Sequence, residues 1–185
     1  MERIKELAES ELIQQCLNNH VLAQNELYRR YAGKMMGVCM RYAKNRDDAK
    51  DILQDAFVRV YLNLTSFRGQ GSFEGWIKRI MINTAIKHYR KNLKFAGNTD
   101  IEAAYDVGFD NGIISKMTVN ELMGLVQQLP DGYRTIFNLY AIEGYQHNEI
   151  SELLGISEGT SKSQLARSRN YLIKLIQGNN SAIHL

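Results

Sequence analysis

Proline, which breaks helices, and cysteine, which builds covalent and metal sites, are scarce in this sequence. Its 185 residues include one proline and two cysteines. Cys16 and Cys39 have no metal-binding or redox spacing and lie among apolar residues, so we expect buried thiols in a reducing compartment. The four histidines form no cluster of potential ligands. The sequence therefore predicts no metal site.

Signals for export, membrane insertion and catalysis are also missing. The first residues, MERIKELAESELI, are charged and have no continuous apolar core, which argues against a signal peptide. No apolar run approaches the roughly 20 residues that span a bilayer. No set of nucleophile, base and acid is visible, and no phosphate-binding loop. We expect a cytoplasmic protein that is not an enzyme, has no cofactor or small-molecule substrate and does not insert into membranes.

What the sequence does contain is typical of a helical protein whose charges lie in separate blocks. Apolar residues make up 44% of the chain and charged residues 23%, a normal globular balance. From Gly75 to Thr99 there are six Lys and Arg and no acid, whereas from Asp100 to Glu121 there are five acids and one Lys. Because ordinary surfaces mix signs, these blocks indicate segments with different partners.

The domain organisation follows from a break in helical periodicity. The stretch FAGNTDIEAAYDVGFDNG is polar and contains several glycines. We predict an all-α fold of two small helical domains, residues 1–94 and 117–185, joined by a flexible linker, residues 95–116.

The first domain is expected to contain several amphipathic helices. Apolar residues three and four apart predict a short helix that includes Leu12 and Cys16, and a longer one from about Leu27 to Tyr42, with a break at Asn18-Asn19. A third helix is expected in KNRDDAKDILQDAFVRVYLNL, which starts with Asn and Asp residues suited to capping. Its apolar positions face a core: Ala49, Ile52, Leu53, Ala56, Phe57, Val60 and Leu64. Its acids share the outer face: Asp48, Asp51 and Asp55.

A glycine-containing loop and a basic helix follow. After the loop TSFRGQGS, Ser72 is suited to cap a helix from about Phe73 to Asn92. Two apolar faces of this helix leave a polar stripe between them, formed by Asn83, Lys87, Arg90 and Lys91. A stripe of this kind is commonly a solvated surface, but its single sign of charge favours an anionic partner.

The second domain carries the pattern of a helix-turn-helix. One helix starts at Leu129-Pro130-Asp131 and ends at Gly144. A short helix from about Asn148 to Leu154 is followed by a turn at Gly155 with Ile156 buried. Ser157 caps the next helix, which is expected to run to about Ile176.

The outward face of that last helix suits DNA. If Leu165 and Leu172 point inward, the outward and flanking side chains are Thr160, Lys162, Ser163, Gln164, Arg167, Arg169 and Lys174. Hydroxyl and amide groups near a helix start suit base edges, whereas Arg and Lys suit phosphates. A helical hairpin within a bundle has the same apolar pattern and remains an alternative.

Three segments together resemble the extracytoplasmic-function sigma factors, which are small specificity subunits of bacterial RNA polymerase. Asp48 to Phe57 is similar to the family's core-binding helix. Ser66 to Lys91 is similar to its −10 recognition loop and helix, and Glu149 to Arg169 to its −35 helix-turn-helix. The segments occur in the family's order. No segment remains for the additional domains of housekeeping sigma factors, so the resemblance implies an alternative sigma factor of the sigma-70 family, with sigma regions 2 and 4.

The resemblance implies transcription initiation with core RNA polymerase, duplex −35 and single-stranded −10 promoter DNA and an anti-sigma factor as partners. The residues implied in core binding are Asp48, Asp51, Gln54, Asp55 and Phe57. Those implied at the −10 element are Phe67, Arg68, Gly69, Ser72, Trp76, Asn83, Lys87, Arg90 and Lys91. Those implied at the −35 element are Thr160, Lys162, Ser163, Gln164, Arg167 and Arg169.

These roles have physical reasons. An acidic helix face suits a basic partner helix. A flipped base costs a few kcal/mol of unpairing, so the loop must form a close pocket, and the basic stripe suits a single strand. Trp76 suits a core position at least as well as a stacking platform.

Four residues depart from the family's usual pattern. Lys87 stands where the family commonly has Asp, and Met81 where it has a small residue. Ser161 replaces a β-branched apolar residue and Gln164 replaces Arg. We interpret all four positions as lying on or near DNA-facing surfaces, so the preferred promoter sequence is not predicted.

Two other functions remain open from the residues. A free-standing helix-turn-helix repressor or activator explains the second domain but not the acidic helix or the basic segment of the first. A helical protein that binds only other proteins leaves the basic faces merely solvated.

Overall fold

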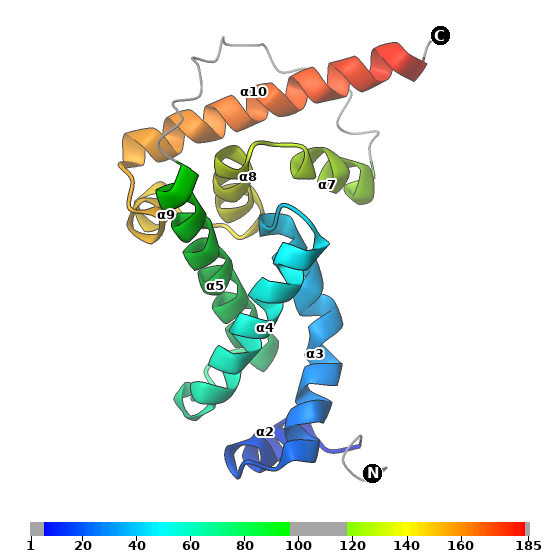
Figure 1. Ribbon diagram of the computed structural model, residues 1–185, viewed down its shortest axis with the longest axis vertical. Helices are drawn as coiled ribbons and strands as arrows, with labels where there is room; N and C mark the ends of the chain where they lie inside the picture. Colours follow the sequence, from blue (N-terminus) through cyan, green and yellow to red (C-terminus); the bar gives the residue numbers. More distant parts are fainter. Residues whose placement is uncertain (1–5, 97–117, 184–185) are drawn as a thin grey trace. The chain divides into compact units, whose positions relative to one another are not determined.

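Every regular element in the described part of the chain is helical, as expected. The structure is a computed structural model that describes residues 6–96 and 118–183 (Figure 1). Residues 97–116 of the expected linker lie outside the described residues. The chain divides into two compact units between His88 and Tyr89, inside a helix and earlier than the domain boundary expected at residue 94.

All four helices expected in the first domain are present, although the second begins at Val21, before the expected start at about Leu27. The elements of the N-terminal unit are α2 (Glu9–Leu17), α3 (Val21–Tyr42), α4 (Arg46–Leu62), the short 3-10 helix η1 (Leu64–Ser66) and the larger part of α5 (Phe73–Ala96). The break between α2 and α3 lies at Asn18-Asn19, as expected, and Asn19 has φ of +58°, a conformation that Asn tolerates better than most residues. Helices α3 and α4 pack along each other, and α2 packs on α3 (Figure 1).

The two cysteines belong to the core of this unit, as the sequence predicts. Cys16 and Cys39 are free thiols and are buried. The Cys39 Sγ lies 3.9 Å from the Sδ of Met81 on α5. Burial raises the pKa of Cys16 to about 11 and that of Cys39 to about 12. Both side chains therefore act as small apolar residues at neutral pH.

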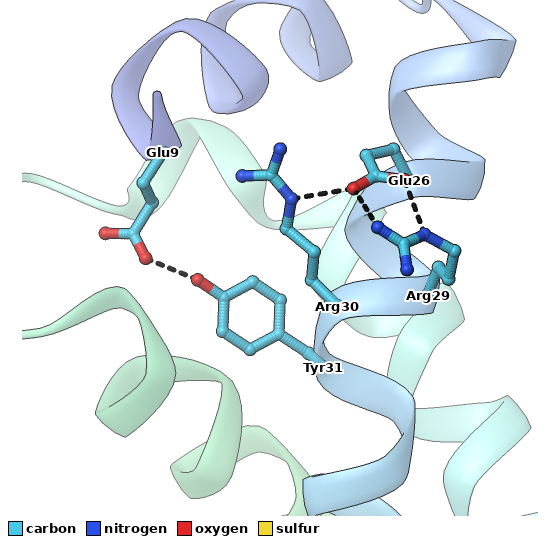
Figure 2. Close-up of polar contacts among 5 residues, drawn as sticks. All are labelled: Glu9, Glu26, Arg29, Arg30 and Tyr31. Atoms are coloured by element: carbon cyan, nitrogen blue, oxygen red, sulfur yellow. Dashed lines mark hydrogen bonds and ion pairs between the residues drawn. The ribbon is translucent and has the colours of Figure 1, made fainter. Parts of the chain in front are cut away.

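A buried carboxylate organises the start of α3. Glu26 is only 5% exposed and accepts hydrogen bonds from Nε and Nη2 of Arg29, both at 2.7 Å, and from Nε of Arg30 at 2.8 Å (Figure 2). These two guanidinium groups hold the pKa of Glu26 down to about 2. The next residue, Tyr31, donates its hydroxyl to Glu9 of α2. One turn of α3 thus carries both a charged cluster and a link to α2.

The C-terminal unit contains one helix that the sequence reading missed. Its elements are α7 (Val119–Gln127), α8 (Asp131–Phe137), the π-helical turn η2 (Asn138–Ile142), α9 (His147–Leu154) and α10 (Glu158–Ile183). The missed helix, α7, begins with a capping box. Thr118 Oγ1 accepts from the N–H of Glu121 at 3.3 Å, and the Glu121 carboxylate accepts from the N–H of Thr118 at 2.8 Å.

Helix α10 extends beyond the predicted end at about Ile176, to Ile183, and it has two packing partners. Its first half packs on α9, and its second half buries Leu172 and Ile176 against α7 and α8. The α7–α8 side of this core consists of Leu125, Val126, Leu129 and Tyr133. The apolar stripe of α10 therefore continues beyond the helix-turn-helix itself.

We expect Glu26→Gln to lower the free energy of unfolding at neutral pH. Hydrogen bonds to charged groups contribute about 1.5–3 kcal/mol, and the amide keeps the shape of the side chain but loses its charge. The folded pKa of Glu26 lies below its ordinary value of 4.5. Its contribution is therefore complete above pH 4.5 and is lost as the pH falls toward 2.

Urea unfolding of the full chain across this pH range measures both effects. The exposed Glu11→Gln on α2 is the matched control and should unfold like the wild type. A deficit of the Glu26 variant that stays constant from neutral to acid pH contradicts an origin in the ion pairs.

Candidate nucleic-acid and polymerase interfaces

Helix α4 begins at a side-chain cap, as the sequence predicts. Asn45 Oδ1 accepts hydrogen bonds from the backbone N–H groups of Asp47 and Asp48, at 2.9 and 2.8 Å. The Asn45 amide also donates to the carboxylate of Asp48, at 3.3 Å. Asp48 is half-buried, so its carboxylate is partly used within the helix start.

The outer surface of α4 presents the other polar residues expected in core binding. Asp51, Gln54 and Asp55 are exposed, and we refer to these three as the α4 face. The same surface continues toward the end of the helix with two exposed apolar side chains, Val58 (57% exposed) and Leu62 (76% exposed). An acidic surface with an apolar extension suits a partner helix that is basic and amphipathic.

One member of the α4 face contacts the basic helix. The Oδ2 of Asp55 lies 2.8 Å from Nε2 of His88 on α5. Both side chains are partly exposed, so the pair adds about 0–1 kcal/mol to stability. The carboxylate of Asp55 remains accessible to a further partner on its solvent side, since 60% of the side chain is exposed.

Phe57 lies in the core, as its place in the apolar stripe of this helix predicts. Its side chain is only 3% exposed, with ring centroids 4.7 Å from Tyr28 on α3 and 6.2 Å from Tyr61 on α4. This burial leaves little of the ring at the surface, and a role of Phe57 in core binding stays a prediction. The ring packs α4 against α3.

An aromatic cluster lies beneath the glycine-containing loop. Phe73 is buried, and its ring stacks on Trp76 at 5.6 Å with an interplanar angle of 15°. Phe67 contacts both rings, at 4.9 and 5.7 Å between centroids. Phe67 and Trp76 are each half-buried, so Trp76 has part of its ring in the cluster and part at the surface.

The loop above this cluster exposes the residues expected at the −10 element. Arg68, Gly69 and Ser72 are exposed. Gly69 has φ of +69°, a conformation that a side chain disfavours and that lets the backbone turn sharply. Ser72 Oγ accepts from the N–H of Gly75 at 3.1 Å, which confirms it as the cap of α5.

Helix α5 exposes the polar stripe that the sequence predicts. Its exposed members are Asn83, Lys87, Arg90 and Lys91. Met81, which we expected on or near a DNA-facing surface, is instead completely buried beside Cys39. The departure at Met81 therefore concerns packing and not the exposed stripe.

The helix-turn-helix has the predicted parts. Ile150 and Leu154 of α9 are buried, and the helix ends at Gly155 with φ of +69°, where a Cβ would be strained. Ile156 is half-buried rather than buried. Ser157 Oγ accepts from the N–H of Thr160 at 3.0 Å, which confirms the cap of α10.

The residues expected to read DNA lie on one side of α10. Thr160, Ser163, Gln164 and Arg167 follow the spacing of one helix face, and all four are exposed or half-buried. We refer to these four as the α10 face. Local contacts orient two of them, since Thr160 Oγ1 lies 2.9 Å from Ser157 Oγ and the Ser163 hydroxyl donates to the backbone oxygen of Thr160 at 3.0 Å.

The three flanking basic residues, Lys162, Arg169 and Lys174, are also exposed. Lys162 Nζ lies 3.4 Å from the carboxylate of Glu158, and its side chain remains 61% exposed. The guanidinium carbon of Arg169 lies 6.0 Å from the ring centroid of Tyr140 in η2. Arg169 thus contacts an aromatic face as well as being exposed.

The inward stripe of α10 contains two serines, one of which was expected on or near the DNA-facing surface. Ser161, Leu165, Ser168 and Leu172 are buried and repeat every three or four residues. Ser161, which we expected on or near the DNA-facing surface, is completely buried and contacts His147 of α9. The position of Ser161 four residues before Leu165 is the signal that could have placed it inside.

The described residues, 6–96 and 118–183, contain no helix with the length and hydropathy of a membrane span. The same residues contain no group of three His, Cys, Asp or Glu side chains that could hold a metal ion.

Comparisons with known proteins match both parts of the chain. Residues 27–94 match the family model Sigma-70 region 2, and residues 120–172 match Sigma-70, region 4. The chain is 31% identical over 159 residues to the ECF RNA polymerase sigma factor SigW of Bacillus subtilis, covering 80% of this chain and 85% of that protein. It is 29% identical over 185 residues to the ECF RNA polymerase sigma-E factor of Haemophilus influenzae, covering 94% and 97%.

Among solved structures, the chain is similar to the sigma factor RpoE from Bartonella quintana, which was crystallised with the anti-sigma factor NepR. That similarity has a TM-score of 0.49 and 18% identity, covering 83% of this chain and 96% of that chain. The assignment of family rests on the sequence matches to regions 2 and 4 and to SigW. The chain belongs to the extracytoplasmic-function sigma factors of the sigma-70 family, which are not enzymes and which direct RNA polymerase to promoters.

Proposed function

We propose that this sigma factor divides its work among three surfaces. The α4 face binds core RNA polymerase, the loop at residues 67–72 with the stripe of α5 binds the single-stranded −10 element, and the α10 face reads the duplex −35 element. In this proposal region 2 occupies residues 1–94, region 4 occupies residues 117–185, and residues 95–116 connect them. The protein acts in the cytoplasm, where RNA polymerase is found.

The observation that carries the proposal is the separation of charge between these surfaces. The α4 face exposes two carboxylates, whereas the α5 stripe exposes amide and basic groups. No Asp or Glu follows Glu158 in the sequence, and that carboxylate already contacts Lys162. A basic helix surface attracts phosphates and an acidic one attracts a basic protein surface. A free-standing repressor has no need of the acidic surface.

The proposal keeps direct contact with polymerase for Asp51, Gln54 and Asp55. Asp48 contributes through the start of α4 and Phe57 through the packing of α4 on α3. At the −10 element, Phe67 and Trp76 form the base of the loop, and Arg68, Gly69 and Ser72 form its exposed part. An anti-sigma factor that covers the DNA-reading surfaces is a further proposed partner, supported by membership in the family.

The test of the overall function combines the full chain with core RNA polymerase and a promoter library. We expect transcripts to start from a subset of promoters that share an upstream and a downstream element, because the chain has two separate DNA-reading surfaces. Sequencing of the transcripts identifies both elements. Strong specific DNA binding without polymerase, together with no transcripts, contradicts the proposal and favours a repressor or activator.

We expect Asp55→Asn to weaken binding to core polymerase about three- to fivefold, because it removes a partly exposed charge worth up to about 1 kcal/mol. The loss should shrink at high salt, where exposed charges are screened. Titration of labelled protein with core enzyme measures the affinity. His88→Ala is the matched control, because it removes the same ion pair but keeps the carboxylate. Equal losses in the two variants contradict a contact between Asp55 and polymerase.

We expect Gln164→Ala to remove base preference at one position of the upstream element. A bidentate contact of an amide with a base contributes about 1–3 kcal/mol of discrimination. Transcription from promoters with a randomised upstream element gives the preference at each position. Lys162→Ala serves for comparison, since loss of a phosphate contact weakens all sequences alike. An unchanged preference in the Gln164 variant rules out base reading by this side chain.

A further inference from the structure

A polar cluster connects three elements of the helix-turn-helix. His147 is the first residue of α9, and its ring stacks on Tyr140 of η2 with 4.6 Å between centroids and 22° between planes. The Nδ1 of His147 lies 2.9 Å from the Oγ of Ser161 on α10. Arg169, two turns further along α10, lies over the Tyr140 ring. The cluster therefore contacts α10 at two points on its length.

The Ser161 contact is directional in a way that apolar packing is not. Ser161 is completely buried, between the α10 face residues Thr160 and Gln164 in sequence. Apolar contacts are non-directional and tolerate small rotations of a helix, whereas a hydrogen bond weakens when its distance or angle changes. A rotation of α10 about its axis that lengthens the Ser161–His147 contact also turns Thr160 and Gln164 away from their present direction.

We propose that His147 is a positioning residue for −35 recognition. Through Ser161, it fixes the rotation of α10 on α9 and thereby the direction in which Thr160 and Gln164 point. The inference rests on the proposed reading of the −35 element by the α10 face. The ring of His147 is itself held by Tyr140, so the π-helical turn η2 supports the same contact.

The protonation state of His147 gives the cluster a pH dependence, because a charged ring would lie partly buried and close to the positive charges of Lys162 and Arg169. Burial, and after it the positive charge of Lys162, lower the pKa of His147; Glu158 opposes them, and Arg169 adds a smaller lowering effect. The folded protein thus favours the neutral ring, whose ordinary pKa is 6.5. Because the folded pKa is depressed, the stabilisation is complete above pH 6.5 and is lost as the pH falls below it.

A direct contact between His147 and DNA is the competing explanation, and the two ring nitrogens separate it from positioning. Nδ1 faces Ser161, so a contact with a DNA phosphate requires Nε2. Asn places a polar atom near the position of Nδ1, and Gln places one near that of Nε2. His147→Asn therefore keeps the Ser161 contact, whereas His147→Gln keeps the reach toward a phosphate.

The experiment uses holoenzyme assembled from the full chain and core polymerase. The probes are a promoter selected by the wild-type holoenzyme and the same promoter with its upstream element scrambled. The ratio of open complexes on the two probes measures upstream discrimination. We expect His147→Ala, His147→Gln and Ser161→Ala each to lower this ratio about tenfold, which is the loss of one buried hydrogen bond of about 1.4 kcal/mol. His147→Asn should stay within about threefold of the wild type.

Two further readouts separate positioning from a general loss of structure. The double variant His147→Ala/Ser161→Ala should lose no more than either single variant, because both remove the same contact. Lowering the pH from about 7.5 to about 5.5 should reduce the ratio for the wild type but not for His147→Asn. The exposed neighbour Asn148→Ala is the matched control and should behave as the wild type. Opening of the scrambled promoter should not change in any variant.

Each contrary outcome has a definite meaning. Rescue by His147→Gln but not by His147→Asn shows a phosphate contact and overturns the inference, as do additive losses in the double variant. If His147→Ala and Ser161→Ala both keep the upstream discrimination of the wild type, the inference is overturned, but the proposed reading of the upstream element by the α10 face is not. Absence of upstream discrimination in the wild type overturns the proposed reading by α10, and this inference with it.

Discussion

Burial of one stripe on each helix is the constraint on which both units depend. An α-helix has 3.6 residues per turn, and an amphipathic helix buries only the face that carries its apolar side chains. The opposite face stays available to partners. In α4 the buried stripe includes Ile52 and Phe57, which leaves the α4 face exposed. In α10 the buried stripe includes Ser161 and Leu165, which leaves the α10 face exposed. The same packing that stabilises each unit therefore determines which side chains reach polymerase or DNA.

Local sequence signals predicted the helix ends well where a single residue caps or ends the helix that contains it. The caps at Asn45 and Ser157 and the turn at Gly155 are confirmed, because each depends only on residues within a few positions. Helix α7 was missed, although the spacing of Thr118 and Glu121 is a local signal of the same kind. Its short apolar run was hard to separate from the neighbouring polar stretch.

Sequence reasoning was weaker where a residue's role depends on distant neighbours. The acidic spacing of α4 placed Asp51 and Asp55 outside, but it could not show that Phe57 is packed by Tyr28 of another helix. In the same way, a serine in a basic, polar helix looks exposed until its partner is known. The partner of Ser161 is His147, 14 residues earlier in the sequence. Among the four departures from the family pattern, Met81 and Ser161 are internal, whereas Lys87 is exposed and Gln164 is half-buried.

The sulfur chemistry of the N-terminal unit has a consequence for its reaction with oxidants. Thiol oxidants react with the thiolate, and the raised pKa of Cys16, about 11, leaves roughly one thiolate in ten thousand at neutral pH. The pKa of Cys39 is raised further, to about 12, and its Sγ lies against the Sδ of Met81. Both cysteine side chains are buried. These two cysteines are therefore chemically quiet. Oxidation of either thiol first requires the packing around it to open.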